Sequence, residues 1–116
     1  MKIIDRIFGI LLALGGVGHG FGSYQAYHHD PMALLWALSA SFAGELLAAV
    51  NLLRTARPGD RALAWISLGG CLVWIGFVVC FGHLIGNYLD FRFLINFIVT
   101  AVLAVFSLRG ALRKPA

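Results

Sequence analysis

Residues 18–24 read GHGFGSY and close the first long apolar run of the chain. The stretch returns in altered form at residues 82–88, which read GHLIGNY and close the third run. Both copies follow the pattern Gly-His-x-x-Gly, then Ser or Asn, then Tyr. Each copy stands where an apolar run gives way to a short polar turn, so each marks the end of a predicted helix. The repeat therefore predicts two similar helical hairpins.

Four apolar runs make up most of the sequence. We predict helices at about residues 3–22, 32–53, 61–85 and 91–108, with Asp30 and Asp60 as candidate N-caps of the second and third. Each run holds about 18–25 residues, which is the length an α-helix needs to cross ~30 Å of hydrocarbon. The chain is 60% hydrophobic and 12% charged, whereas soluble domains carry roughly 25% charged residues. We therefore predict one all-α domain over residues 1–116, an integral membrane four-helix bundle.

The basic residues lie between the runs, and this placement sets the expected topology. Three clusters hold all of them except Arg92: Lys2 and Arg6; Arg54, Arg57 and Arg61; Arg109, Arg113 and Lys114. Short clusters of this kind are topology signals, not a stripe that follows phosphates, so we expect no nucleic-acid partner. The positive-inside rule then places both termini in the cytoplasm and both Gly-His turns outside. We expect a bacterial inner (plasma) membrane.

Glu45 is the residue least suited to a lipid environment. It lies near the middle of the second run, where a charged side chain costs on the order of 3 kcal/mol. We therefore expect its side chain to face the bundle interior. Two roles stay open: a functional carboxyl group that anchors a ligand, carries a proton or partners a histidine, and a packing residue that hydrogen-bonds between helices.

His19 and His83 occupy matching places in the two motifs, so we expect them at similar depth on opposite sides of the bundle. As a pair they could be axial ligands of haem, ligands of another metal ion, or hydrogen-bond partners of a quinone or lipid headgroup. Each could instead be an interfacial side chain bonded to a carbonyl group or water. The helical rise places His19 about 12 Å from Glu45 in depth, so contact between them needs long side chains, water or a ligand.

Polar and aromatic residues near the outer turns complete the candidate site. Tyr24 and Tyr88 fall in the expected outer aromatic belt. Asn96 begins a polar stripe with Thr100 and Ser107 on the fourth run, and this stripe favours hydrogen bonds between helices. The full predicted ligand-binding set is His19, Tyr24, Glu45, His83, Tyr88 and Asn96, with His19 and His83 as candidate metal or haem ligands.

The sequence holds no recognisable catalytic motif. It has no Gly-rich phosphate loop after a strand, no Ser/His/Asp set, no CxxC and no HExxH. The catalytic residues are therefore unassigned, and we do not expect this chain to be an enzyme by itself.

Two segments resemble DoxX-like membrane proteins. Residues 43–54 (AGELLAAVNLLR) resemble the second-helix segment of that family, and residues 5–12 (DRIFGILL) are similar to its Arg- and Gly-containing start. Four spans in a chain of this length also fit. The resemblance implies that Glu45 points into the bundle. It also implies an association with redox-linked membrane complexes, including quinone-related sulfur oxidation.

We therefore expect a small membrane protein that binds an apolar or redox-active ligand inside the bundle, possible cofactors being haem and a quinone. Its partners would be the lipid bilayer, a small apolar ligand, and a second copy or a larger redox complex. Two alternatives stay open. One is a proton-coupled transporter or channel-like homodimer that uses Glu45, and the other is a structural subunit of a membrane complex.

Overall fold

A computed structural model describes residues 1–114, and its four helices confirm the predicted all-α architecture. They are α1 (Lys2–Tyr27), α2 (Pro31–Ala56), α3 (Arg61–Ile85) and α4 (Phe91–Leu112). Each helix is long and apolar enough to cross a membrane. The most extensive packing joins α1 to α2 and α3 to α4, so the helices form the two expected hairpins.

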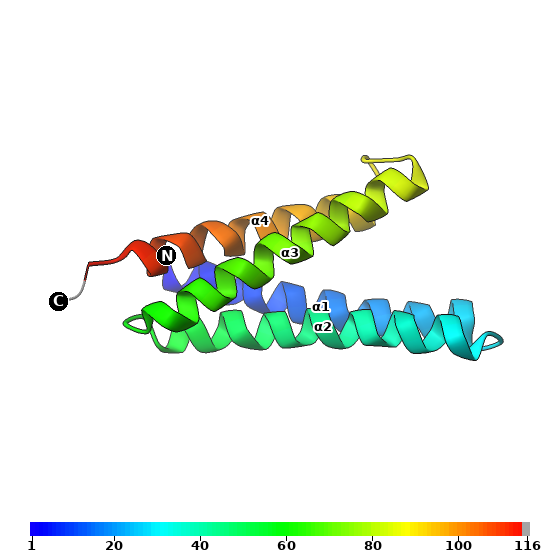
Figure 1. The fold of residues 1–116 in the computed structure, drawn as a ribbon, viewed down its shortest axis with the longest axis horizontal. Coiled ribbons are helices and arrows are strands. Elements are labelled where there is room, and N and C mark those ends of the chain that lie inside the picture. The colour runs from blue at the N-terminus through cyan, green and yellow to red at the C-terminus, as the bar shows by residue number, and fades with distance from the viewer. Residues whose placement is uncertain (115–116) are drawn as a thin grey trace.

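The two hairpins meet at one end of the molecule and diverge toward the other (Figure 1). The N-terminus, the α2–α3 loop and the end of α4 lie together, and we call this the terminal end. The α1–α2 and α3–α4 turns lie at the opposite end, where the hairpins are apart, and we call this the turn end. Three basic clusters of the sequence are thus gathered at the terminal end.

Aspartate side chains cap the N-termini of three of the helices. The carboxylates of Asp30 and Asp60 accept hydrogen bonds from the backbone N–H groups of Ala33 (3.1 Å) and Leu63 (2.9 Å). Asp90 begins α4 in a similar way. Such bonds satisfy backbone donors that have no partner within the helix. The predicted N-caps at Asp30 and Asp60 are confirmed.

Three helices run further than the sequence predicted. α1 extends beyond residue 22 to Tyr27, α2 beyond 53 to Ala56, and α4 beyond 108 to Leu112. The prediction ended each helix where polar residues began. Polarity does not end a helix, however, and no proline stands in these extensions to remove a backbone donor.

The two Gly-His motifs end their helices differently. Gly86 adopts a left-handed backbone conformation with φ of 67° and caps α3. The N–H of Asn87 then donates to the carbonyl of Gly82 at 3.2 Å, which is the bonding pattern of a Schellman turn. The matching Gly22 stays helical within α1. The repeat in sequence is therefore not a repeat in helix termination.

A buried ion pair joins α1 to α2 near the terminal end. The Arg54 guanidinium donates two hydrogen bonds, of 2.7 and 2.8 Å, to the Asp5 carboxylate. Arg54 is 5% exposed and Asp5 is 7% exposed. Our placement of Arg54 between two helices was wrong, because α2 continues past Arg54 to Ala56 and the Arg54 side chain is buried.

Further hydrogen bonds connect this ion pair to α3 and α4. Arg54 donates to Asn51 Oδ1 at 3.1 Å, and Ser67 donates to the same oxygen at 2.9 Å. The hydroxyl groups of Ser67 and Ser107 are hydrogen-bonded at 2.8 Å. We call Asp5, Asn51, Arg54, Ser67 and Ser107 the terminal network. It takes at least one side chain from every helix, so it fixes how the two hairpins meet.

We expect Asp5→Asn to lower the free energy of unfolding by about 3–5 kcal/mol, because it leaves the buried Arg54 charge without its partner. Asp60→Asn is the control. Asp60 pairs with the exposed Arg57 at 3.8 Å, asparagine keeps the N-cap, and an exposed pair contributes only about 0–1 kcal/mol. Equilibrium unfolding in mixed detergent micelles, followed by circular dichroism, measures both. Equal losses in the two variants would contradict a buried ion pair.

Candidate functional site

Glu45 lies where α2 packs closely against α1. A methyl group added at Gly16 would overlap the Glu45 carboxyl group, so only glycine leaves room for that carboxyl at this point of α1. The Glu45 Oε1 atom is buried and has no hydrogen-bond partner within residues 1–114. Glu45 as a residue is half-buried, but its Oε1 atom faces α1 inside the bundle, in the direction that the sequence predicted, and the hydrogen-bonding capacity of this oxygen is unused.

Two more buried polar atoms lack partners in the described part of the chain. They are Nε1 of Trp74 on α3 and Oγ1 of Thr100 on α4. Thr100 is fully buried, and the Trp74 ring packs against Gly44, the neighbour of Glu45 in α2. At least nine in ten buried polar groups in proteins are hydrogen-bonded, so three unpartnered atoms require an explanation.

The packing of the helices places Trp74 and Thr100 at the same level. The hydrogen bond between Ser67 and Ser107 sets the register of α3 against α4. Trp74 follows Ser67 by seven positions, and Thr100 precedes Ser107 by seven positions. Seven residues are about two helical turns, or ~10 Å along the axis. Because α3 and α4 are antiparallel, both steps lead the same distance toward the turn end.

Contacts of Glu45 and of its neighbour Gly44 place Glu45 at the same level as Trp74 and Thr100. The contact between Gly44 and Trp74 aligns α2 with α3, and the contact between Gly16 and Glu45 aligns α1 with α2. Each of these residues lies near the middle of its helix. We call Glu45, Trp74 and Thr100 the mid-helix site.

The three side chains of the mid-helix site have complementary chemistry. The Trp74 indole can only donate a hydrogen bond, an ionised Glu45 carboxylate can only accept, and the Thr100 hydroxyl can do both. A hydroxyl group, which both donates and accepts, is therefore a suitable partner for each of the three, whereas a carbonyl group is a suitable partner for Trp74 and Thr100 only. The surrounding core is apolar and includes Leu12, which is 3% exposed.

An apolar layer separates the mid-helix site from the terminal network. Leu47 and Leu103 belong to the buried core, and each lies between the two polar groups along its helix. Leu103 is fully buried. The bundle thus holds one polar group whose members bond to one another, and a second polar group at mid-helix whose members do not.

The structure does not bring His19 and His83 into the mid-helix site. Both residues are exposed, and they lie on different hairpins that diverge toward the turn end (Figure 1). Residues 1–114 contain no cluster of three or more His, Cys, Asp or Glu side chains that could hold a metal ion. The roles predicted for the two histidines in ligand or haem binding stay predictions.

The other predicted residues also lie apart from Glu45. Tyr24 and Tyr88 are exposed at the turn end, at 59% and 47%. The Tyr88 ring packs edge-on against Phe93 with 5.2 Å between centroids. Asn96 donates to a backbone carbonyl of its own helix at 2.8 Å. Within the predicted polar stripe, only Ser107 bonds to other helices.

Sequence reasoning missed Trp74 and assigned Thr100 only to a polar stripe. A signal was present, because the spacing from Ser67 to Trp74 equals the spacing from Thr100 to Ser107. Reading it required the register between α3 and α4, which no local pattern gives.

Comparison with protein-family models, curated proteins and solved structures finds no match for this chain. The resemblance to DoxX-like proteins therefore stays an expectation from sequence.

We expect Gly16→Ala to displace the Glu45 carboxyl group and to destabilise the bundle by about 1–3 kcal/mol through overpacking. Gly18→Ala is the matched control, since a methyl group there meets no atom within 4 Å. Alanine is the better helix former, so Gly18→Ala should be neutral or stabilising by up to about 1 kcal/mol. Unfolding in detergent measures both. A Gly16→Ala protein as stable as Gly18→Ala would contradict the close contact with Glu45.

Proposed function

We propose that this chain is an integral membrane protein that binds a small amphipathic ligand between its helices. The polar group of the ligand would bond to Glu45, Trp74 and Thr100, and its apolar part would extend among the apolar side chains of the bundle. One observation carries the proposal: three buried polar atoms without hydrogen-bond partners lie at the same level, near the middle of the helices.

The outer surface supports the membrane location. In the most apolar 18-residue segment of each helix, only 17–33% of the residues are buried within the protein. Large side chains such as Phe42, Phe77 and Leu84 are exposed at 68%, 66% and 84%. Soluble monomers rarely expose contiguous apolar surface of this extent, whereas lipid accepts it. The basic clusters favour a cytoplasmic terminal end in a bacterial inner membrane, with Arg92 as the exception at the turn end.

The depth of the mid-helix site favours a ligand over simple packing. In a membrane, the middle of the helices lies in the hydrocarbon, where water is scarce and an unpartnered polar atom costs several kcal/mol. A ligand with one polar group on an apolar body removes that cost. Quinone-like and lipid-like molecules have this form, and a quinone carbonyl can accept hydrogen bonds from Trp74 and Thr100. We do not extend the proposal to haem, because His19 and His83 are not held together.

The buried carboxyl group also raises the alternative of a proton pathway. Such a pathway along the bundle would have to pass Leu47 and Leu103 and then the Arg54 guanidinium. An apolar layer followed by a fixed positive charge is a barrier to protons. Ligand binding at the mid-helix level is therefore the function that the geometry favours.

The proposal is tested by what co-purifies with the protein from native membranes. We expect one small molecule per chain, detected by mass spectrometry, in the wild type and in His83→Asn. Glu45→Leu and Trp74→Phe should each reduce occupancy about tenfold or more, because each removes a buried hydrogen-bonding group.

Unfolding measurements on the same samples separate ligand loss from misfolding, and an absorption spectrum tests for haem. A wild type that carries no stoichiometric ligand would refute the proposal. So would a ligand retained equally by all variants. A Soret band lost in His83→Asn would instead favour the haem interpretation of the histidines.

A further inference from the structure

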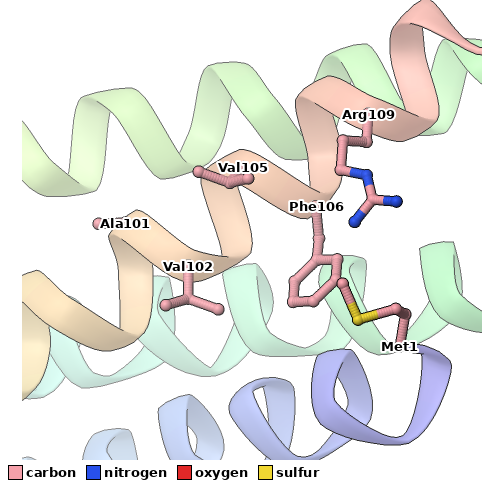
Figure 2. A pocket seen from close by; sticks show the side chains of 6 residues that line it. All are labelled: Met1, Ala101, Val102, Val105, Phe106 and Arg109. Atoms are coloured by element: carbon pink, nitrogen blue, oxygen red, sulfur yellow. The ribbon is translucent and has the colours of Figure 1, made fainter.

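An apolar groove lies between the terminal half of α4 and Met1 at the start of the chain (Figure 2). Its volume is about 320 Å³, and its lining residues are Met1, Ala101, Val102, Val105, Phe106 and Arg109. The five uncharged residues are all apolar. Arg109 is the single charged side chain, and Figure 2 shows its guanidinium beside Phe106 and above Met1. The groove therefore combines an apolar wall with one cation at its end.

The positive charge at Arg109 is not balanced by a neighbour in residues 1–114. Arg109 is exposed, and its side chain takes part in none of the ion pairs or hydrogen bonds of the described chain. The two acidic residues of the terminal end are engaged elsewhere, Asp5 with Arg54 and Asp60 with Arg57. Other basic residues at this end only add to the positive potential.

We infer that this groove holds one acyl chain of an anionic phospholipid, with the headgroup phosphate at Arg109. The apolar wall matches the chain, and a guanidinium presents paired N–H donors to phosphate oxygens. The volume is at the lower end of the range of small-molecule sites, which suits one chain better than a whole lipid. Arg109 lies in the last turn of α4, the level at which a spanning helix meets the headgroups.

The inference rests on the membrane location proposed above and not on the mid-helix site. The two sites share no residue, and variants of Glu45 or Trp74 should leave the groove unchanged. Failure of the co-purification test would therefore not remove the lipid site, and failure of the lipid test would not remove the mid-helix ligand.

The headgroup contact is tested with the delipidated full-length protein in detergent, titrated with phosphatidylglycerol or with phosphatidylcholine of the same chain length. Native mass spectrometry counts the bound lipids. We expect phosphatidylglycerol to bind at least about fivefold more tightly, and Arg109→Gln to remove this preference, as one basic residue near an anionic headgroup accounts for about that factor. Arg113→Gln is the matched control, since Arg113 is also exposed at this end but does not line the groove.

The apolar wall is tested by filling the groove. Val105→Phe should weaken phosphatidylglycerol binding about fivefold or more, whereas Val73→Phe should not. Val105 and Val73 are equally exposed, at 58% and 59%, but only Val105 lines the groove. Circular dichroism confirms that each variant keeps its helices.

Two results would overturn the inference. Phosphatidylglycerol binding that is unchanged in both Arg109→Gln and Val105→Phe would place the lipid elsewhere. A Val105→Phe variant that turns a dimer into a monomer without losing bound lipid would show that a second copy of the chain covers the groove.

Discussion

The bidentate contact between Arg54 and Asp5 is the constraint on which the arrangement of the helices depends. Two opposite charges are buried together at the terminal end, and neither can leave the other without a large desolvation cost. A buried ion pair contributes little net stability when compared with apolar packing, but it tolerates very few geometries. Asn51, Ser67 and Ser107 extend its hydrogen bonds to the other hairpin. The four helices therefore have one relative register in which every residue of the terminal network has its hydrogen-bond partner.

That register also determines which residues lie together two helical turns closer to the turn end. Small residues on α1 allow α2 to approach closely, and Gly16 in particular leaves space for the Glu45 carboxyl group. The same register brings Trp74 and Thr100 to this level from the second hairpin. The bundle therefore contains two polar groups that differ in kind. The terminal network is closed on itself and holds the fold, whereas the mid-helix site has hydrogen-bonding capacity left over. This difference supports the proposal that the mid-helix site binds a ligand, whereas the terminal network is structural.

Much of this architecture followed from the sequence. Hydropathy and length were enough to predict four helices. The aspartates that precede two of these helices were enough to predict their N-caps. The free-energy cost of placing a charge in an apolar helix was enough to predict that Glu45 faces the bundle interior. Arg54 was misassigned because an arginine near a helix end reads the same whether it faces a loop or the core. Its partner Asp5 lies in another helix, so no local pattern connects them.

The histidines show a second limit of the sequence. The two Gly-His motifs match in residue type, but glycine-rich helix segments have no apolar face that indicates where a polar side chain points. The structure leaves His19 and His83 exposed on separate hairpins. Trp74 was overlooked for the opposite reason, since an indole in an apolar helix reads as packing until its N–H is found buried without a partner.

The central claim is that the Trp74 indole N–H faces a bound group at mid-helix, and it is tested most directly by nitrogen-15 NMR of the indoles in lipid nanodiscs. Trp36 and Trp65 are exposed and act as internal references, at 67% and 48%. We expect the Trp74 indole resonance to be protected from exchange with water and to shift when co-purified small molecules are stripped, while the Trp36 and Trp65 resonances stay in place. A Trp74 resonance that does not respond to stripping, or that exchanges with water as fast as the other two, would contradict the account.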